Sequence, residues 1–372
     1  MSAPEPNISA LLEERIAGGD FPSAVYLVAE RGAVVFAAAL GDAVSEPQRI
    51  AATLETIYDL ASLTKPLVTG LLCALQVEAG ELALNSLVSR YLPEFDRKDK
   101  QEISVGQLLT HTSGLPAWQP LYILAAGKPD QASSATANLE LEYRPGARVV
   151  YSDLGFIVLG LLLERLTGKR LLELAQSEIF EPLNLQRTFF NPKRAMQTLI
   201  AASETGSNYE RDMVRNSSAG DYENRRRDLI WGEVHDGNAY FLGGAAGHAG
   251  LFSTAGETLA LANQFISGQT KLLTPATCEL FPQNLTPGLN ESRSFAWQLA
   301  ATKDSAAGPD LPPDSFGHSG FTGTSCWIDS RRERVFILLT NRTHNRALPF
   351  VNINSVRRRF HSLAVAAIEQ SL

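Results

Sequence analysis

Two pairs of β-rich segments lie at opposite ends of this sequence, and they restrict its fold more than any other feature. SAVYLVAE and AVVFAAAL (23–30 and 33–40) flank a short turn, and TSCWIDS and RVFILLTN (324–330 and 334–341) flank a charged one. Each pair predicts a β-hairpin. The segments between them that show the apolar spacing of helices are 65–80, 104–111, 155–168 and 171–183. If the two hairpins share a sheet, the helical stretch is an insertion into an α/β domain.

The length of 372 residues suits one large domain or two. We expect an α/β sheet domain from residues 1–80 and 290–372, and a mostly helical domain from residues 81–289. A cleft between two such layers is where small-molecule sites tend to form. The active site is therefore expected in that cleft.

The composition argues against several classes of function. The 33 basic and 40 acidic residues give a net charge of −7, so nucleic acid is not expected as a partner. Cys73, Cys278 and Cys326 are too widely spaced for a metal site and odd in number, so we expect them to be buried thiols. The sequence contains no His-Glu-x-x-His, phosphate-loop or dinucleotide-binding pattern. We expect no metal and no other cofactor.

The N-terminal segment MSAPEPNISALLEERI has neither a basic start nor an apolar core, so it does not read as a signal peptide. The longest apolar run, 154–163, is too short to cross a bilayer. The sequence as it stands is expected to be cytoplasmic. It would be periplasmic or secreted if a leader had been removed from a longer chain. The oligomeric state cannot be predicted from these features.

The segment LASLTKPLV (60–68) starts an apolar helix but places the polar residues Ser62 and Lys65 three positions apart. Residues at this spacing share one face of a helix. A serine hydroxyl is a weak nucleophile unless a neighbour takes its proton. A lysine whose pKa is lowered by burial or by nearby cations can do so. The pair is a candidate nucleophile with its activator, and the alternative is a capping serine beside a solvated lysine.

Two further motifs follow at Tyr151–Asp153 and His318–Gly320. Together with Ser62–Lys65 they give the order S-x-x-K, Y-x-[NS]-like and [KH]-[ST]-G within residues 24–360. The sequence therefore resembles the serine β-lactamase and penicillin-binding-protein superfamily, in the branch of class C β-lactamases, D-Ala-D-Ala peptidases and β-lactamase-fold esterases. The resemblance implies a β-lactamase/transpeptidase-like fold. In that fold, an antiparallel sheet from both chain ends is flanked by helices and carries a mostly helical insertion.

The resemblance also implies a role for each matching catalytic residue. Ser62 would be the nucleophile, and Lys65 would be its proton acceptor or an electrostatic support. Tyr151 would point its phenol at Ser62 and pass the proton to the leaving group. A phenol close to two cations can be a phenolate near neutral pH.

Further roles are implied along the third motif. The backbone N–H groups of Ser62 and Phe321 would form the oxyanion hole. Ser319 and Gly320 would bind the substrate, since a glycine lets the substrate lie close against the strand. The reaction would be acylation of Ser62 followed by hydrolysis.

Two positions depart from the family pattern. Asp153 stands where lactamases carry Asn, and a carboxylate accepts hydrogen bonds but cannot donate them. It would either pair with Lys65 and hold it protonated, or cap the following helix. His318 replaces a lysine that helps to bind a substrate carboxylate, and a histidine is mostly neutral at pH 7. Arg342, at the end of a strand, could restore that anchor or lie on the surface.

Four other polar residues each have a structural and a functional interpretation. His111 is expected to order a helix–loop junction rather than to react. His235, Asp236 and Asn238 either line the cleft or satisfy a buried loop. The polar, nearly aperiodic segment 203–228 predicts a long surface excursion.

The favoured function is a serine hydrolase that forms an acyl-enzyme at Ser62, with a carboxylesterase first. The alternatives are a D-Ala-D-Ala carboxypeptidase or penicillin-binding protein, a class C-like β-lactamase, and a sensor that is acylated without turnover. The expected substrate is a small ester, amide or β-lactam.

Overall fold

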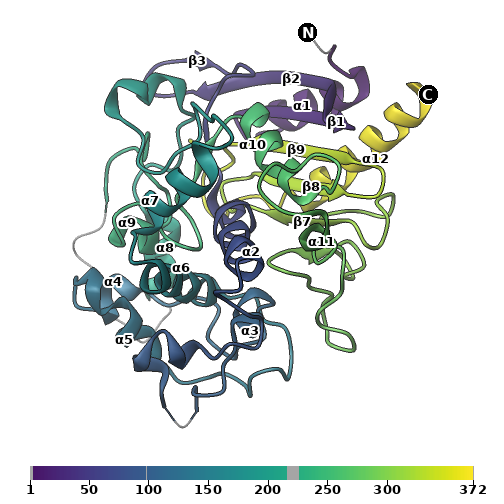
Figure 1. The fold of residues 1–372 in the computed structure, drawn as a ribbon. Coiled ribbons are helices and arrows are strands. Elements are labelled where there is room, and N and C mark those ends of the chain that lie inside the picture. The colour runs from purple at the N-terminus through teal and green to yellow at the C-terminus, as the bar shows by residue number, and fades with distance from the viewer. Residues whose placement is uncertain (1–2, 98, 216–225, 372) are drawn as a thin grey trace.

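The computed structural model describes residues 3–97, 99–215 and 226–371 (Figure 1). The strands are β1 (Ser23–Glu30), β2 (Ala33–Val44), β3 (Ile50–Ala51), β4 (Tyr58–Asp59), β5 (Phe252–Ser253), β6 (Gln298–Leu299), β7 (Phe316–Ser319), β8 (Ser325–Asp329) and β9 (Arg334–Thr340). The helices are α1 (Pro6–Ala17), α2 (Leu71–Glu78), α3 (Val105–Leu109), α4 (Leu121–Leu124), α5 (Ala132–Ala137), α6 (Asp153–Thr167), α7 (Leu171–Ala175), α8 (Asn208–Arg215), α9 (Gly237–Phe241), α10 (Ala255–Ala262), α11 (Pro275–Cys278) and α12 (Asn354–Ser371).

The main sheet has seven strands in the order β3-β2-β1-β9-β8-β7-β6. Both predicted hairpins form, as the antiparallel pairs β1–β2 and β8–β9. The two chain ends meet where β1 pairs with β9, with Val25 opposite Leu339. The expected antiparallel sheet built from both ends of the chain is therefore confirmed.

The two faces of the sheet bury different cores, because successive side chains of a strand point to opposite sides. In β1, Tyr26 faces the core formed with α1 and α12, and Leu27 faces the larger core of the helical part. Figure 1 shows the two ends of the chain beside the sheet, with α3, α4 and α5 at the opposite end of the molecule.

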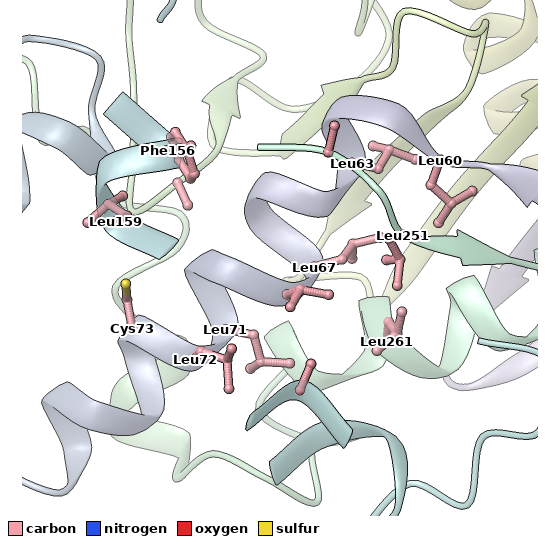
Figure 2. Packing of buried hydrophobic residues seen from close by; sticks show 14 of the residues in the cluster. Leu60, Leu63, Leu67, Leu71, Leu72, Cys73, Phe156, Leu159, Leu251 and Leu261 are labelled. Carbon is pink, nitrogen blue, oxygen red and sulfur yellow. The ribbon is translucent and has the colours of Figure 1, made fainter. Parts of the chain in front are cut away.

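The segment after β4 runs through the larger core, as Figure 2 shows for Leu60, Leu63, Leu67 and Leu71. All four side chains are fully buried. Burying a leucine side chain contributes about 1.5–3 kcal/mol relative to leaving it exposed, so this apolar face anchors the segment that carries Ser62.

The division into 1–80 with 290–372, and 81–289, remains a proposal. The helix α10 belongs to the middle segment by sequence but packs against β1 and β9 of the sheet. We would therefore assign α10 to the sheet domain.

The expected surface excursion over 203–228 is wrong in its first half, because residues 208–215 form α8 and Val214 is buried. Residues 216–225 lie outside the described part. Among the helices of the described residues, none has the length and apolar character that a membrane span requires.

Candidate active site

Ser62 lies in a short 3₁₀ turn, η1 (Ala61–Leu63), rather than in a regular α-helix. A π-helical segment, η2 (Lys65–Gly70), follows directly. Ala61 has φ 48°, a left-handed conformation that non-glycine residues seldom adopt, and its N–H donates to Asp59 Oδ1 at 2.8 Å. Such strain and π-helical turns concentrate at functional sites.

Two groups contact the Ser62 hydroxyl. Lys65 Nζ lies 3.0 Å and the Tyr151 hydroxyl 2.9 Å from Ser62 Oγ. Lys65 also donates to Asp153 Oδ1 at 2.6 Å and to the His248 carbonyl at 3.0 Å. The three N–H groups of a lysine ammonium therefore each have an acceptor. The structure brings together Ser62, Lys65, Tyr151 and Asp153, as the sequence predicted.

Asp153 is the counterion of Lys65, and the helix-capping alternative is wrong. The cap of α6 is Ser152, whose side chain accepts from the Gly155 N–H at 3.2 Å. Burial lowers the pKa of Lys65, but the charges of Asp153 and Tyr151 outweigh it, so the pKa is raised above its usual value. Lys65 is therefore an ammonium in the resting site.

Burial also raises the pKa of Tyr151, and the charge of Lys65 lowers it only in part. The expectation of a phenolate at rest is therefore wrong. The lysine in contact with Tyr151 is already neutralised by Asp153, so it cannot stabilise a second anion as strongly.

The loop 320–324 is hydrogen-bonded to the backbone just before Ser62. Thr322 Oγ1 donates to the Asp59 carbonyl at 2.7 Å, and Thr324 Oγ1 donates to the Leu60 carbonyl at 3.0 Å. Within the described residues, the N–H groups of Ser62 and Phe321 donate to no protein acceptor. These two hydrogen bonds fix the position of the Phe321 N–H relative to the Ser62 N–H. Both groups can therefore donate to a ligand oxygen.

His318 lies on β7 and is 5% exposed. Its Nδ1 lies 3.0 Å from the Ser319 carbonyl, and its ring lies 5.8 Å from that of Tyr151. Burial, followed by the charges of Lys65 and Arg293, lowers the pKa of His318 well below its usual value. His318 is therefore neutral at pH 7, as expected, and does not act as a cation toward an anionic substrate.

Arg342 fits neither sequence interpretation fully. Its Nε donates to the Phe321 carbonyl and its Nη1 to the Val351 carbonyl, both at 2.7 Å, and its guanidinium lies 4.9 Å from the centre of the Phe321 ring. Arg342 therefore supports the loop that carries the Phe321 amide, while also lining the cleft.

Arg357 of α12 was missed by the sequence analysis. It is 5% exposed, and its Nη2 donates to the Gly320 and Thr324 carbonyls at 3.0 and 2.9 Å. Its Nη1 donates to Asn354 Oδ1, and no carboxylate of the described residues forms an ion pair with it. A signal existed, because Arg357 interrupts the buried stripe of an amphipathic helix.

Ser62 lines two cavities. The larger has a volume of about 780 Å³, and Tyr151, His318, Arg342 and Arg357 are among its lining residues. The smaller has a volume of about 160 Å³. Its lining residues are Ala61, Ser62, Trp118, Asp153, Tyr209, Glu210, Met213, His235, Asp236, Gly237, Ala249 and Phe321.

The remaining polar candidates divide between structure and site. His111 Nδ1 accepts from the Ser152 N–H at 3.0 Å, which orders the loop that carries Tyr151, as expected. Asn238 satisfies a buried loop by accepting from the Leu121 N–H at 2.8 Å. Asp236 caps α9, and its Oδ1 lies 2.8 Å from His248 Nε2. Asp236 also lines the small cavity.

In the part of the chain that the structure describes, no group of His, Cys, Asp or Glu side chains is arranged to hold a metal ion. The three cysteines are buried free thiols.

Solved structures share this fold along nearly the whole chain. EstCE1, described as a hydrolase with promiscuous acyltransferase activity, aligns with a TM-score of 0.73 and 24% identity, covering 96% of this chain and 97% of its own. A penicillin-binding protein homologue from Caulobacter crescentus aligns with a TM-score of 0.73 and 21% identity, covering 99% of each chain. The fold defines the class as a β-lactamase/transpeptidase-fold protein.

Sequence comparison identifies the family. The Beta-lactamase family model matches residues 8–356, so the chain belongs to that family, whose members are hydrolases. A Salmonella agona (strain SL483) protein named "Putative D-alanyl-D-alanine carboxypeptidase" is 34% identical over 332 residues, which cover 82% of this chain and 74% of that protein. An Escherichia coli (strain K12) protein of the same name is 30% identical over 355 residues, which cover 87% and 79%.

Proposed function

We propose that this protein is a serine hydrolase that forms an acyl-enzyme at Ser62 and acts first of all on carboxylic esters. The observation that carries the proposal is the hydroxyl of Ser62, which lies within 3.0 Å of both Lys65 Nζ and the Tyr151 hydroxyl. A serine becomes nucleophilic when a neighbouring group can take its proton.

The proton of Ser62 passes to Tyr151 in this mechanism. Lys65 cannot take this proton, because the nitrogen of a lysine ammonium has no lone pair. Tyr151 accepts the proton once the cluster of Tyr151, Lys65 and Asp153 has lost one proton, and Lys65 stabilises the phenolate then formed. Tyr151 next protonates the leaving group, and a water molecule hydrolyses the acyl-enzyme by the reverse proton path.

The N–H groups of Ser62 and Phe321 receive the oxyanion of the tetrahedral intermediate. The threonines that tie loop 320–324 to Asp59 and Leu60 hold these donors before the substrate arrives. Donors that are already in place cost no reorganisation during the reaction, and removing one typically slows an acyl transfer about 100- to 1,000-fold.

Esters are favoured over β-lactams because of two side chains. Asp153 is committed to Lys65 and offers no N–H to an acyl amide. His318 is neutral and supplies no charge to the carboxylate of a β-lactam. An ester with an uncharged acyl group needs neither interaction.

A second candidate is a D-Ala-D-Ala carboxypeptidase. The named relatives favour it, and so does Arg357, a buried cation beside the cleft without an acidic partner among the described residues. A peptide ending in D-Ala-D-Ala would then be cleaved with a free C-terminus, and the same peptide with an amidated C-terminus would be cleaved far more slowly. Equal rates for the two peptides, or no cleavage of either, would reject this candidate.

The decisive experiment is hydrolysis of p-nitrophenyl butyrate by the wild type and by Ser62→Ala. We expect kcat to fall by about four orders of magnitude or more in the variant. Ser89→Ala, outside the cleft, serves as the matched control and should retain the wild-type rate. A Ser62→Ala rate equal to that of the wild type would rule out the mechanism.

Intact-protein mass after mixing with a penicillin separates the esterase from the carboxypeptidase, the sensor and the β-lactamase. A lasting adduct on the wild type alone would favour the carboxypeptidase or the sensor. Rapid penicillin turnover would favour a β-lactamase. Intact penicillin with no adduct leaves the esterase.

A further inference from the structure

The two cavities that meet at Ser62 differ in charge as well as in size. The large one is lined by four basic residues, Arg293, Lys303, Arg342 and Arg357, and by three acidic ones, Asp153, Glu291 and Asp304. The small one is lined by three acidic residues, Asp153, Glu210 and Asp236, and none of the described residues lining it is a lysine or an arginine. Asp153 is already paired with Lys65. Asp236 lies 2.8 Å from His248, so Glu210 is the carboxyl group of this cavity without an ion-pair partner among the described residues.

The position of Tyr151 decides which part of a substrate enters which cavity. Tyr151 lines the large cavity and not the small one, whereas Ser62 and Phe321 line both. The leaving group must reach the hydroxyl that protonates it, so it lies in the large cavity. The acyl group then points into the small cavity. This step rests on the function proposed above for Ser62 and Tyr151.

The small cavity suits a short acyl group. Its volume of about 160 Å³ is roughly one fifth of the 780 Å³ of the large cavity. A small acyl group therefore fills it better than a long fatty acyl chain.

One oxygen of the Glu210 carboxyl group has no donor, although the Tyr122 hydroxyl and the Gly237 N–H donate to this group. Its Oε1 is buried and has no hydrogen-bond partner among the described residues. A buried carboxyl oxygen without a donor costs free energy until a ligand supplies one. Burial, followed by the charge of Asp236, raises the pKa of Glu210 to about 8. Glu210 therefore carries a proton at pH 7, and a cation placed beside its carboxyl group could replace that proton.

Two basic side chains, Arg226 and His248, lie near Glu210 and Asp236. Arg226 directs its guanidinium to the carbonyls of Val234 and His235. His248 contacts the Asp236 oxygen that also caps α9, at 2.8 Å. Neither donates a hydrogen bond to Glu210 Oε1.

Aromatic rings complete the wall of the small cavity. Trp118, Tyr209 and Phe321 line it, and the rings of Tyr209 and Phe321 lie 4.6 Å apart. Aromatic faces attract ammonium groups, and most strongly where water is excluded. Carboxyl groups and aromatic rings together suit a small primary ammonium better than a neutral polar group.

We propose that the acyl group of the natural substrate is a small aminoacyl group, whose ammonium is bound by Glu210 and Asp236. In the reaction, Ser62 Oγ bonds to the aminoacyl carbon, and the bond from that carbon to the leaving oxygen or nitrogen breaks. The Ser62 proton passes through Tyr151 to the leaving group. Water then cleaves the aminoacyl-Ser62 ester and releases a free amino acid. Glu210 acts on specificity and not on the chemical step.

The test compares two esters of the same shape. The alanine p-nitrophenyl ester, as D- and L-enantiomers, carries an ammonium where p-nitrophenyl isobutyrate carries a methyl group. The readout is the ratio of kcat/KM for the better alanyl enantiomer to that for isobutyrate, corrected for spontaneous hydrolysis. We expect a ratio of about ten or more for the wild type, since a site built for a polar group discriminates strongly against its apolar analogue.

Glu210→Gln is expected to bring this ratio close to one. Because both rates are measured on the same protein, a general loss of folding or activity cancels. The control is Asp212→Asn, which removes a half-exposed carboxylate of the same helix and should keep the wild-type ratio.

The outcomes separate this proposal from the function it rests on. A wild-type ratio near one, with isobutyrate hydrolysis that requires Ser62, overturns the aminoacyl proposal alone. A high ratio that Glu210→Gln leaves unchanged overturns the assignment to Glu210. Hydrolysis of both esters that persists in Ser62→Ala, or hydrolysis of neither by the wild type, overturns the proposed function and this inference with it.

Discussion

Lys65 Nζ and Asp153 Oδ1 lie 2.6 Å apart, with the lysine fully buried and the carboxylate 19% exposed. This ion pair supplies the charged groups of the cluster that Lys65, Tyr151 and Asp153 form around Ser62. Its carboxylate raises the pKa of Lys65 and that of Tyr151, because a nearby anion favours the protonated form of both. The loss of one proton from the cluster is thereby moved to higher pH.

Asp153→Asn should move the activity to lower pH. Removing the anion lowers the pKa of Tyr151 and of Lys65, so the rising limb of kcat/KM against pH should shift down by roughly one to three units. The measurement is the pH profile of p-nitrophenyl butyrate hydrolysis, with the wild type recorded in the same buffers. A limb that stays in place, or moves to higher pH, would contradict the role of Asp153.

Gly320→Ala should impair both folding and activity. An added Cβ would lie 2.1 Å from Thr324 Oγ1 and 2.6 Å from the Leu60 carbonyl, the two groups that tie loop 320–324 to Ser62. We expect a loss of about 1–3 kcal/mol in the free energy of unfolding and a fall of about 100-fold in kcat. Urea unfolding and ester hydrolysis measure the two effects. Gly256→Ala is the control, since nothing lies within 4 Å of its added Cβ, and it should not destabilise the protein.

Arg357→Met should remove the charged donor of the Gly320 and Thr324 carbonyls, which would keep only the backbone donors Gly323 N–H and Gly320 N–H. A hydrogen bond from a charged donor contributes about 1.5–3 kcal/mol, so the melting temperature should fall and kcat for a neutral ester should fall with it. Arg359→Met, at an exposed position of the same helix, should have little effect on either. Equal melting temperatures for the two variants would show that Arg357 does not hold the loop.

His361 should weaken the protein in acid. It is fully buried, and burial lowers its pKa to about 3. The unfolded chain binds a proton at this histidine below about pH 6.5, and the folded chain does not. Its contribution to stability is therefore complete above pH 6.5 and is lost as the pH falls toward 3. The expected slope is about 1.4 kcal/mol per pH unit.

His361→Gln tests this expectation through the slope and not through the absolute stability. Between pH 6 and 4, the free energy of unfolding of the variant should fall less steeply than that of the wild type. The two slopes should differ by about 1.4 kcal/mol per pH unit, which is the effect of one bound proton. Parallel curves would mean that His361 is protonated in the folded protein.

The strands and the three motifs could be predicted from the sequence because both depend on near neighbours. Short β-rich apolar runs marked β1, β2, β8 and β9, and spacings of two or three residues marked Ser62–Lys65 and Tyr151–Asp153. Cooperative burial then closed the sheet across the chain ends. The segment 208–215 was missed because most residues of α8 are polar and the helix has only two turns.

Side chains that work across the fold could not be predicted in this way. Thr254 and Glu257 have the spacing of a capping box, and Thr254 does cap α10. The Glu257 carboxylate instead accepts from the Gln186 and Arg187 N–H groups at 2.8 and 2.9 Å. Arg357 and Glu210 likewise reach the site from elements that lie far from Ser62 in the sequence.

The sequence by itself identified the residues around the nucleophile, since helical spacing places Lys65 beside Ser62 and the family resemblance implies the role of Tyr151. Only the tertiary structure decided their charges. Burial alone would favour a neutral Lys65, but a carboxylate 88 positions away and the His248 carbonyl hold it as an ammonium. Charge state depends on every group packed around a site, and that packing exists only once distant segments have folded together.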